Sequence, residues 1–316
     1  MAPRSTASHL SYDLRPAKQS ERRMLLDILK SAGDIGLPIS RYRYVGMGAN
    51  RFYDFLLIHR YLGLTSMVSL EHDPKMLDRA EFNCPYDFIK VIGESAATFL
   101  GYDTYTDPTI TWFDYDGGLS PQIVRDIVDL GVKTKVGDFA FVTVYGGPPR
   151  ALEALNAEAR LAWLQDEMRA VSGLIVREDT ETAEFPVAVH KVLKAAFQNA
   201  FAARRDGKFQ FLIQVEYSDS VPMVTVGGGF VADGQASALK SKIDHVMPFL
   251  AKDKLYRIKS LHLTERERVV FDRAVTKRSK NSSERRLLKR LGFKESEIKA
   301  YADLLRFVPR YVETIV

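Results

Sequence analysis

The chain lacks the features that would indicate an oxidising compartment or a membrane. Its 316 residues include one cysteine, Cys84, so an internal disulfide is excluded and a reducing compartment is favoured. Apolar runs such as Phe139–Val144 are far too short to span a bilayer, and the first ten residues have no apolar signal core. With 20 Gly and 13 Pro, the composition is that of a globular protein. We therefore expect a soluble cytoplasmic protein.

Several common binding motifs are also missing. The six histidines and the single cysteine show no metal-ligand spacing, so we assign none of these residues to a metal site. There is no Gly-Lys-Ser/Thr, which excludes a P-loop. A dinucleotide site would have a third glycine where Arg51 stands, and its absence argues against NAD or FAD. An NAD-linked oxidoreductase is therefore only a weak alternative.

Strand and helix patterns alternate over the first half of the chain. The predicted strands are Tyr42–Val45, Met67–Leu70, Phe88–Ile92, Thr109–Phe113 and Phe139–Val144. A helix over Glu21–Ala32 precedes them, and helices follow them at Arg51–Tyr61, Lys75–Phe82, Ser95–Leu100 and Pro121–Leu130. Five such units predict an α/β, Rossmann-like, doubly wound and mostly parallel sheet.

The pattern then changes. Helices at Ala151–Ala170 and Val187–Arg204 precede two longer strands, Phe209–Tyr217 and Met223–Val231. The five residues between these strands are too few for a parallel crossover, so we predict an antiparallel hairpin that closes the sheet.

We divide the chain into three parts. Residues 1–35 form an N-terminal segment and helix that we interpret as a lid, residues 36–234 form the Rossmann-like core, and residues 235–316 form a basic helical extension. After Gly234 we expect only helices. Thr264 with Glu267 predicts a capping box, and Gly292 predicts a helix C-cap.

Positive charge is concentrated in this extension. Residues 252–290 contain 14 Lys and Arg against 5 Asp and Glu, a balance of +9, whereas the whole chain carries +5. This balance predicts an anionic or nucleic-acid partner, and a solvated helical surface is the alternative. Three short helices in this region are compatible with a helix-turn-helix, but a helical cap on the core is commoner and is our expectation.

Polar residues follow the first four predicted strands. Gly46-Met47-Gly48-Ala49-Asn50 comes after the first, where two glycines let a ligand approach the backbone, although a simple turn explains them too. Glu71 ends the second strand, 23 positions after Gly48, where a carboxylate can hold a ribose. Glu94-Ser95 and Asp114-Tyr115-Asp116 follow the third and fourth. Each of these polar residues taken alone is a common helix cap. Taken together at four successive strand ends, they predict one shared crevice.

This order of residues resembles the class I S-adenosylmethionine (SAM)-dependent methyltransferases. From about Leu14 to the C-terminus the sequence also resembles a bacterial family labelled putative O-methyltransferases. The phrases that carry this narrower resemblance are LRPAKQSERRML, YVGMGANRFYDFLLIHRYLG, MVSLEHD, WFDYDGGL, VPMVTVGG and LLRFVPRYVE.

The resemblance implies a role for each residue group. Gly46, Gly48 and Ala49, with Met47 and Asn50, would line the methionine part of SAM. Glu71, with His72 beside it, would hold the ribose, and Glu94 or Ser95 would lie near the adenine. Asp114, Tyr115 and Asp116 would face the methyl group and the acceptor. The chain departs from the family pattern at Tyr44 and Asn50, where an acid and a third glycine are usual.

Methyl transfer to a hydroxyl needs a group that removes the proton. Asp114 and Asp116 are the candidates, as a base or as metal ligands, and ordinary loop acids are the alternative. Arg15, Lys18, Arg22 and Arg23 predict a lid over an anionic substrate or the cofactor carboxylate, unless they are only a charged helix face. We thus expect a SAM-dependent methyltransferase that methylates an oxygen atom of an unidentified acceptor. The alternative is a non-catalytic methyltransferase-like module that binds a nucleotide or nucleic acid.

Overall fold

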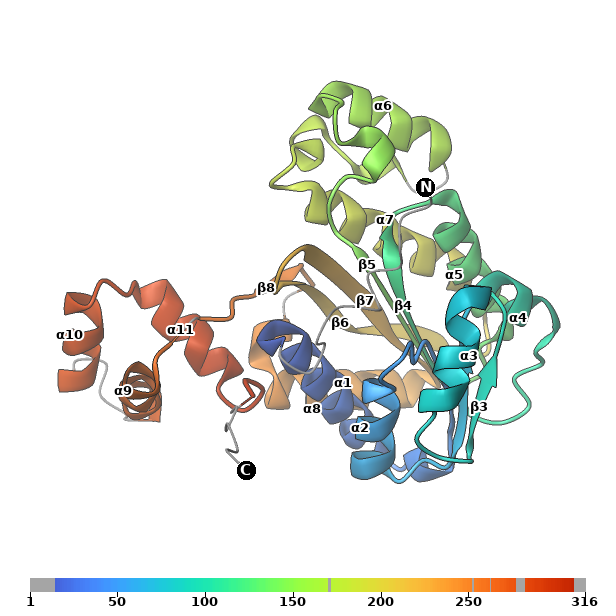
Figure 1. The fold of residues 1–316 in the computed structure, drawn as a ribbon, viewed down its shortest axis with the longest axis horizontal. Helices are drawn as coiled ribbons and strands as arrows, with labels where there is room; N and C mark the ends of the chain where they lie inside the picture. Colours follow the sequence, from blue (N-terminus) through green and yellow to red (C-terminus); the bar gives the residue numbers. More distant parts are fainter. Residues whose placement is uncertain (1–14, 170–171, 252, 262, 277–281, 310–316) are drawn as a thin grey trace.

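A single sheet of eight strands forms the centre of the molecule (Figure 1). The computed structural model describes residues 15–169, 172–251, 253–261, 263–276 and 282–309. The strands are β1 (Arg43–Gly46), β2 (Ser66–Leu70), β3 (Ile89–Ile92), β4 (Thr109–Gly118), β5 (Phe139–Tyr145), β6 (Lys208–Ser218), β7 (Pro222–Val231) and β8 (Tyr256–Ile258). Their order is β3-β2-β1-β4-β5-β7-β6-β8.

The first five strands run parallel to one another, and β7 is antiparallel to both β5 and β6. The predicted Rossmann-like sheet with a closing antiparallel hairpin is therefore confirmed. The carboxyl ends of β1, β2, β4 and β5 lie at the same edge because these strands are parallel, and that edge is where such sheets bind ligands.

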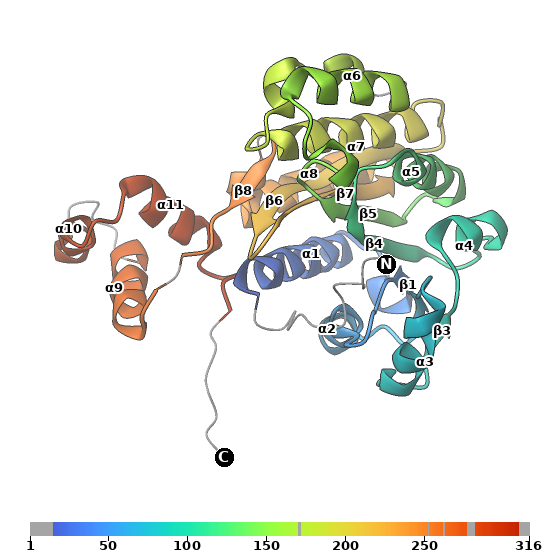
Figure 2. The same cartoon turned by 45° about the horizontal axis from the view of Figure 1, so that its top comes forward.

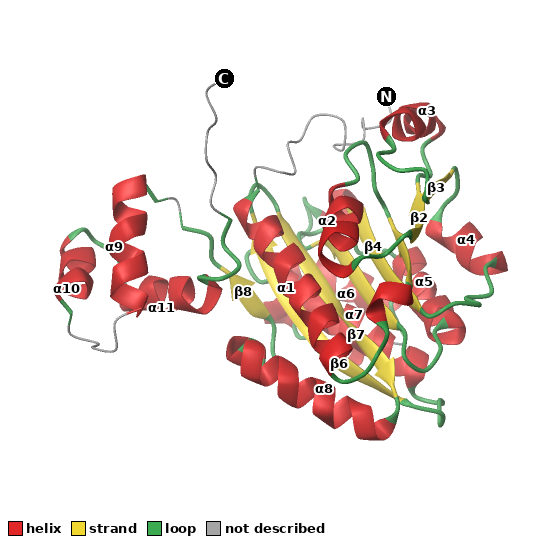
Figure 3. Cartoon of the chain, turned by 90° about the horizontal axis from the view of Figure 1, so that it is seen from below, coloured by secondary structure: helices red, strands yellow, loops and turns green. Residues whose placement is uncertain are grey.

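Helices cover both faces of the sheet (Figure 3). On one face lie α1 (Pro16–Asp34), α2 (Tyr53–Leu62), α3 (Pro74–Asn83) and α8 (Asp233–Val246), and on the other lie α4 (Ala96–Tyr102), α5 (Pro121–Lys133), α6 (Ala157–Glu167) and α7 (Phe185–Phe201). Strand β5 explains the two layers: Phe139 and Phe141 face α1, whereas Ala140 and Val142 face α5 and α7. A strand buried on both faces needs no polar side.

The last three helices do not cover the core, so that expectation was wrong. Helices α9 (Glu265–Thr276), α10 (Ser283–Arg290) and α11 (Glu295–Leu304) lie beside the sheet and share a small hydrophobic core of their own (Figures 1 and 2). Their few apolar side chains suffice for this mutual core and leave the other faces charged. The capping box is confirmed, with Thr264 N donating to Glu267 Oε2 over 2.8 Å. Gly292 was predicted as the C-cap, whereas Leu291 is the C-cap residue of α10 and Gly292, at φ +95°, follows it and ends the helix.

Two further sequence expectations were wrong. The chain is not wholly helical after Gly234, because β8 pairs in parallel with the end of β6, and three residues are too few to give a strand pattern. The helix predicted at Ala151–Ala170 is interrupted, because Asn156 accepts from Ala159 N over 2.9 Å and starts α6 there. Among the described residues, no helix is both long and apolar enough to cross a membrane.

Candidate active site

The loop after β1 is a tight turn built around Gly48. The Gly48 N–H donates to Ser69 Oγ over 3.0 Å, which ties the loop to β2. A Cβ at this position would lie 2.7 Å from both Ser69 Oγ and a ring carbon of Phe52, so packing alone requires glycine here. Ala49 and Phe52 have left-handed φ values of 44° and 50°, which bring the backbone into α2 within a few residues.

Three carboxylates lie near enough to influence one another where β2 and β4 end. Asp116 lies near Asp114 and Glu71, and the pKa of Asp116 is raised to about 6 because protein atoms displace water from its carboxylate and because the other two carry like charge. The residue is still open to solvent on its outer side. The Glu71 side chain is mostly buried and accepts from Asp73 N over 2.9 Å. His72 points into solvent, with Nδ1 3.9 Å from Glu71 Oε1.

One residue after β1 and one after β3 bring polar atoms into the interior without hydrogen-bond partners among the described residues. Both side-chain polar atoms of Asn50, and Oε2 of Glu94, are buried and have no hydrogen-bond partner among the described residues. Ser95 differs, because its Oγ accepts from Thr98 N over 3.1 Å and caps α4. Buried polar groups are almost always satisfied, so unsatisfied ones at strand ends indicate a place for a polar ligand.

Tyr115 and Met47 lie on the other side of the sheet. Strand β4 continues to Gly118, and alternation along it turns Tyr115 away from its two acidic neighbours. The Tyr115 hydroxyl donates to Asp126 of α5 over 2.6 Å, and the Met47 side chain packs against the same hydrophobic core. This position does not support the expected role of Tyr115 beside the methyl group.

The first turns of α1 cross this edge of the sheet and bury a set of charged side chains. Lys18 Nζ lies 2.7 Å from Asp114 Oδ2 and 2.9 Å from Glu21 Oε2. Arg22 is 4% exposed and pairs with Asp54 of α2. These contacts place Lys18 and Arg22 inside the molecule, so α1 is an integral layer over the sheet.

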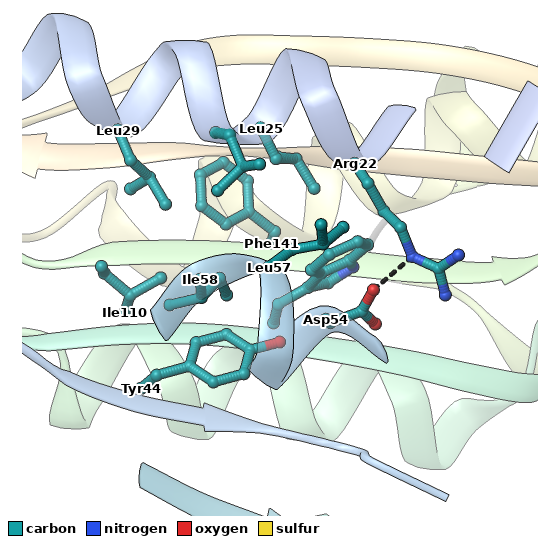
Figure 4. A pocket seen from close by; sticks show the side chains of 11 residues that line it. Arg22, Leu25, Leu29, Tyr44, Asp54, Leu57, Ile58, Ile110 and Phe141 are labelled. Atoms are coloured by element: carbon teal, nitrogen blue, oxygen red, sulfur yellow. Dashed lines mark hydrogen bonds and ion pairs between the residues drawn. The ribbon is translucent and has the colours of Figure 1, made fainter. Parts of the chain in front are cut away.

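The neighbouring space between α1, α2 and the sheet is narrow (Figure 4). Leu25, Leu29, Tyr44 and Phe141 line it, and the Arg22–Asp54 pair lies at one end. Its volume of about 10 Å³ is too small for a ligand. Tyr44, which stands where the family pattern has an acid, is a packing residue here, with its ring 4.8 Å from that of Phe55.

The family described as "Putative O-methyltransferase" matches residues 10–316. The chain belongs to this methyltransferase family. The match extends beyond the sheet to α1 and to the three C-terminal helices, as the sequence phrases predicted.

Three solved structures have folds similar to that of this chain. The plantazolicin methyltransferase BpumL in complex with SAH is 9% identical, with a TM-score of 0.42, over 69% of this chain and 87% of that one. The N-methyltransferase NodS from Bradyrhizobium japonicum WM9 is 10% identical, with a TM-score of 0.38, over 67% and 97%. Cofactor-bound Rv0187 from MTB is 16% identical, with a TM-score of 0.41, over 72% and 87%. The comparison with curated proteins gives no match.

Two other site expectations concern metals and anionic partners. In the described part of this methyltransferase, no group of three His, Cys, Asp or Glu side chains is arranged to hold a metal. The anionic partner of residues 252–290 stays a prediction, and residues 252, 262 and 277–281 lie outside the described ranges. Part of that positive charge is already paired within the chain, since Arg257 contacts Glu184 and Glu216.

Glu21 is the site residue that sequence reasoning missed. It is fully buried and contacts Lys18, which lies three residues earlier on the same helix face. A signal was present: Lys18, Glu21 and Leu25 recur at helical spacing, so two charges lie on the stripe that also carries the apolar core residues.

Proposed function

We propose that this chain transfers a methyl group from SAM to a hydroxyl oxygen of an acceptor, in the crevice at the ends of β1, β2 and β4. Family membership supports methyl transfer. The observation that carries the cofactor site is the set of buried, unpartnered polar atoms of Asn50 and Glu94 in the loops after β1 and β3. A polar ligand bound there would satisfy atoms that otherwise cost free energy.

Each residue of the crevice has a binding role in this proposal. Glu71 accepts hydrogen bonds from the ribose hydroxyls. Asn50 and Glu94 supply a donor and acceptors to the remaining polar groups of SAM. The Gly48 loop lets the backbone approach the ligand. SAM itself supplies a methyl group made electrophilic by the sulfonium sulfur.

The carboxylates at the end of β4 have separate tasks. Asp116 accepts the proton of the acceptor hydroxyl, because a carboxylate whose pKa lies near 6 is ionised at neutral pH and is basic enough to take it. Asp114 is held by the ion pair with Lys18 and adds fixed negative charge beside the reacting groups.

Calorimetric titration with SAM tests the cofactor site. The Glu71→Ala variant should bind SAM about 10- to 100-fold more weakly than the wild type, because it loses hydrogen bonds to a charged acceptor. Asp78→Ala, which removes an exposed acid from α3, is the matched control and should bind normally. Circular dichroism checks that each variant is folded.

Two outcomes would count against the proposal. Unchanged affinity of a folded Glu71→Ala variant would remove the ribose assignment. Failure of the folded wild-type protein to bind SAM would contradict SAM-dependent transfer and favour the non-catalytic binding module.

A further inference from the structure

Lys18 is almost completely enclosed at the edge of the candidate site. Its side chain is 3% exposed, and its ammonium lies 2.7 Å from Asp114 Oδ2 and 2.9 Å from Glu21 Oε2. The rings of Trp112 and Tyr217 flank it, with centroids 4.7 Å and 5.3 Å from Nζ. Burial disfavours the ammonium, but the charges of Asp114 and Glu21 outweigh this cost and raise the pKa of Lys18, so it stays protonated.

Glu21 holds the inner side of this ion pair. It is fully buried, and it accepts hydrogen bonds from Thr143 of β5, over 3.3 Å, and from Thr225 of β7. Trp112 Nε1 in turn donates to Thr143 Oγ1 over 3.0 Å. Lys18 is therefore anchored to β5 and β7 through Glu21. These contacts fix the position of its ammonium relative to Asp114.

Attachment of α1 to the sheet does not require a lysine here. Met24, Leu25 and Ile28 already pack α1 against the sheet, and Arg22 pairs with Asp54. Apolar residues in place of both Lys18 and Glu21 would pack α1 against the sheet without the desolvation cost of a buried ion pair. What the lysine adds is a positive charge beside the Asp114 carboxylate. The Asp114 side chain is 18% exposed and so reaches the crevice.

We propose that Lys18 is a positioning residue of the methyl-transfer site: its ion pair with Asp114 holds that carboxylate in place, which leaves Asp116 as the proton acceptor. This inference rests on the proposed function. It makes α1, an element outside the Rossmann-like core, part of the active site.

The charges around the two carboxylates give the direction of the effect. Asp116 is faced by Asp114 on its own strand, by Glu71 and His72 at the end of β2, and by Lys18. The positive charge of Lys18 lowers the pKa of Asp116 and opposes the two acids. The groups that face Asp114 are Lys18, Glu21 and Arg22 of α1, Tyr44 of β1 and Tyr217 of β6.

Titration of the aspartate carboxyl carbons by ¹³C NMR tests the proposal without any acceptor. In Lys18→Met, the titration midpoint of Asp116 should rise by about one pH unit, because the positive charge that lowers its pKa is lost. Lys18→Arg keeps the charge and should restore an Asp116 midpoint close to that of the wild type. The matched control is Lys191→Met. Lys191 lies in α7, and its ammonium is paired with Asp179 over 2.6 Å.

The outcomes separate the two proposals. An unchanged Asp116 midpoint in a folded Lys18→Met variant, or an equal shift of that midpoint in Lys191→Met, would overturn the role of Lys18. If Lys18→Met does not fold, Lys18→Met combined with Glu21→Gln removes the buried pair together and must show the same rise. Titration of the wild type with SAM tests the proposed function separately, since the NMR measurement needs no cofactor.

Discussion

Asp114 and Asp116 are two residues apart on one strand, yet they should affect stability in opposite directions. The pKa of Asp116 is raised to about 6, from an ordinary value of 3.8, so between these pH values the folded protein binds more protons than the unfolded chain. Folding therefore loses stability as pH rises through this window. Asp116→Asn should be more stable than the wild type at pH 7, by at most about 1 kcal/mol because solvent screens an exposed group, and equal to it below about pH 4.

Asp114→Asn provides the contrast at the same site. It leaves the buried Lys18 ammonium with Glu21 as its remaining carboxylate partner and should cost about 1–3 kcal/mol at pH 7. Urea unfolding at pH 4 and pH 7 measures both variants. Destabilisation of both by similar amounts at pH 7 would contradict the separate environments described for the two acids.

The proximity of Glu71 and Asp116 was predictable, because the carboxyl ends of parallel strands in one sheet share an edge and β2 and β4 flank β1. The orientation of Tyr115 was not. Asp116-Gly117-Gly118 is a typical turn sequence, but β4 continues to Gly118, with a shift of its register against β5 after Asp114. Alternation along the strand turns Tyr115 to the opposite face.

At the scale of elements, the hairpin between β6 and β7 holds the start of α1. Asp219 accepts from Ala17 N over 3.0 Å and from Lys18 N over 2.9 Å, and Arg15 at the N-cap gives no side-chain cap of its own. Asp219→Ala should cost about 1–2 kcal/mol, as the loss of a helix cap does. Hydrogen exchange should speed up in the first turns of α1.

The matched control is Ser95→Ala, which removes the cap of α4. It should lower stability by a similar amount while exchange in α1 stays unchanged. Equal exchange rates in α1 of wild type and Asp219→Ala would show that the hairpin does not hold this helix.

This cap also explains why the start of α1 was missed in the sequence. The apolar stripe predicts a helix from Glu21, whereas α1 starts at Pro16. The residue that caps it lies about 200 positions away along the chain, beyond any local pattern. Local caps were readable, as the Thr264–Glu267 box shows.

At the scale of the whole molecule, the C-terminal helices leave the body at β8 and return to it at Leu304 and Phe307. Phe307 is 1% exposed, in the core that also holds α1, and its ring lies 6.1 Å from that of Phe249. Arg23 donates to the carbonyl oxygen of Phe307 over 3.3 Å, and Arg306 pairs with Asp27 over 2.7 Å. The chain thus joins the main core again at Leu304, the last residue of α11, while the rest of α9 to α11 keeps a separate core. In Figure 2 these helices lie to one side of the sheet.

Two phenylalanine substitutions should therefore have different effects. Phe307→Ala leaves a cavity in the main core and should lower the free energy of unfolding of the whole protein by about 3–5 kcal/mol. Phe271 is fully buried among α9, α10 and α11, so Phe271→Ala should unfold that cluster and leave the main calorimetric transition nearly unchanged. Hydrogen exchange should then rise only in the three helices. If Phe271→Ala lowers the main transition as much as Phe307→Ala does, the two cores unfold as one cooperative unit, and the C-terminal helices stabilise the sheet directly.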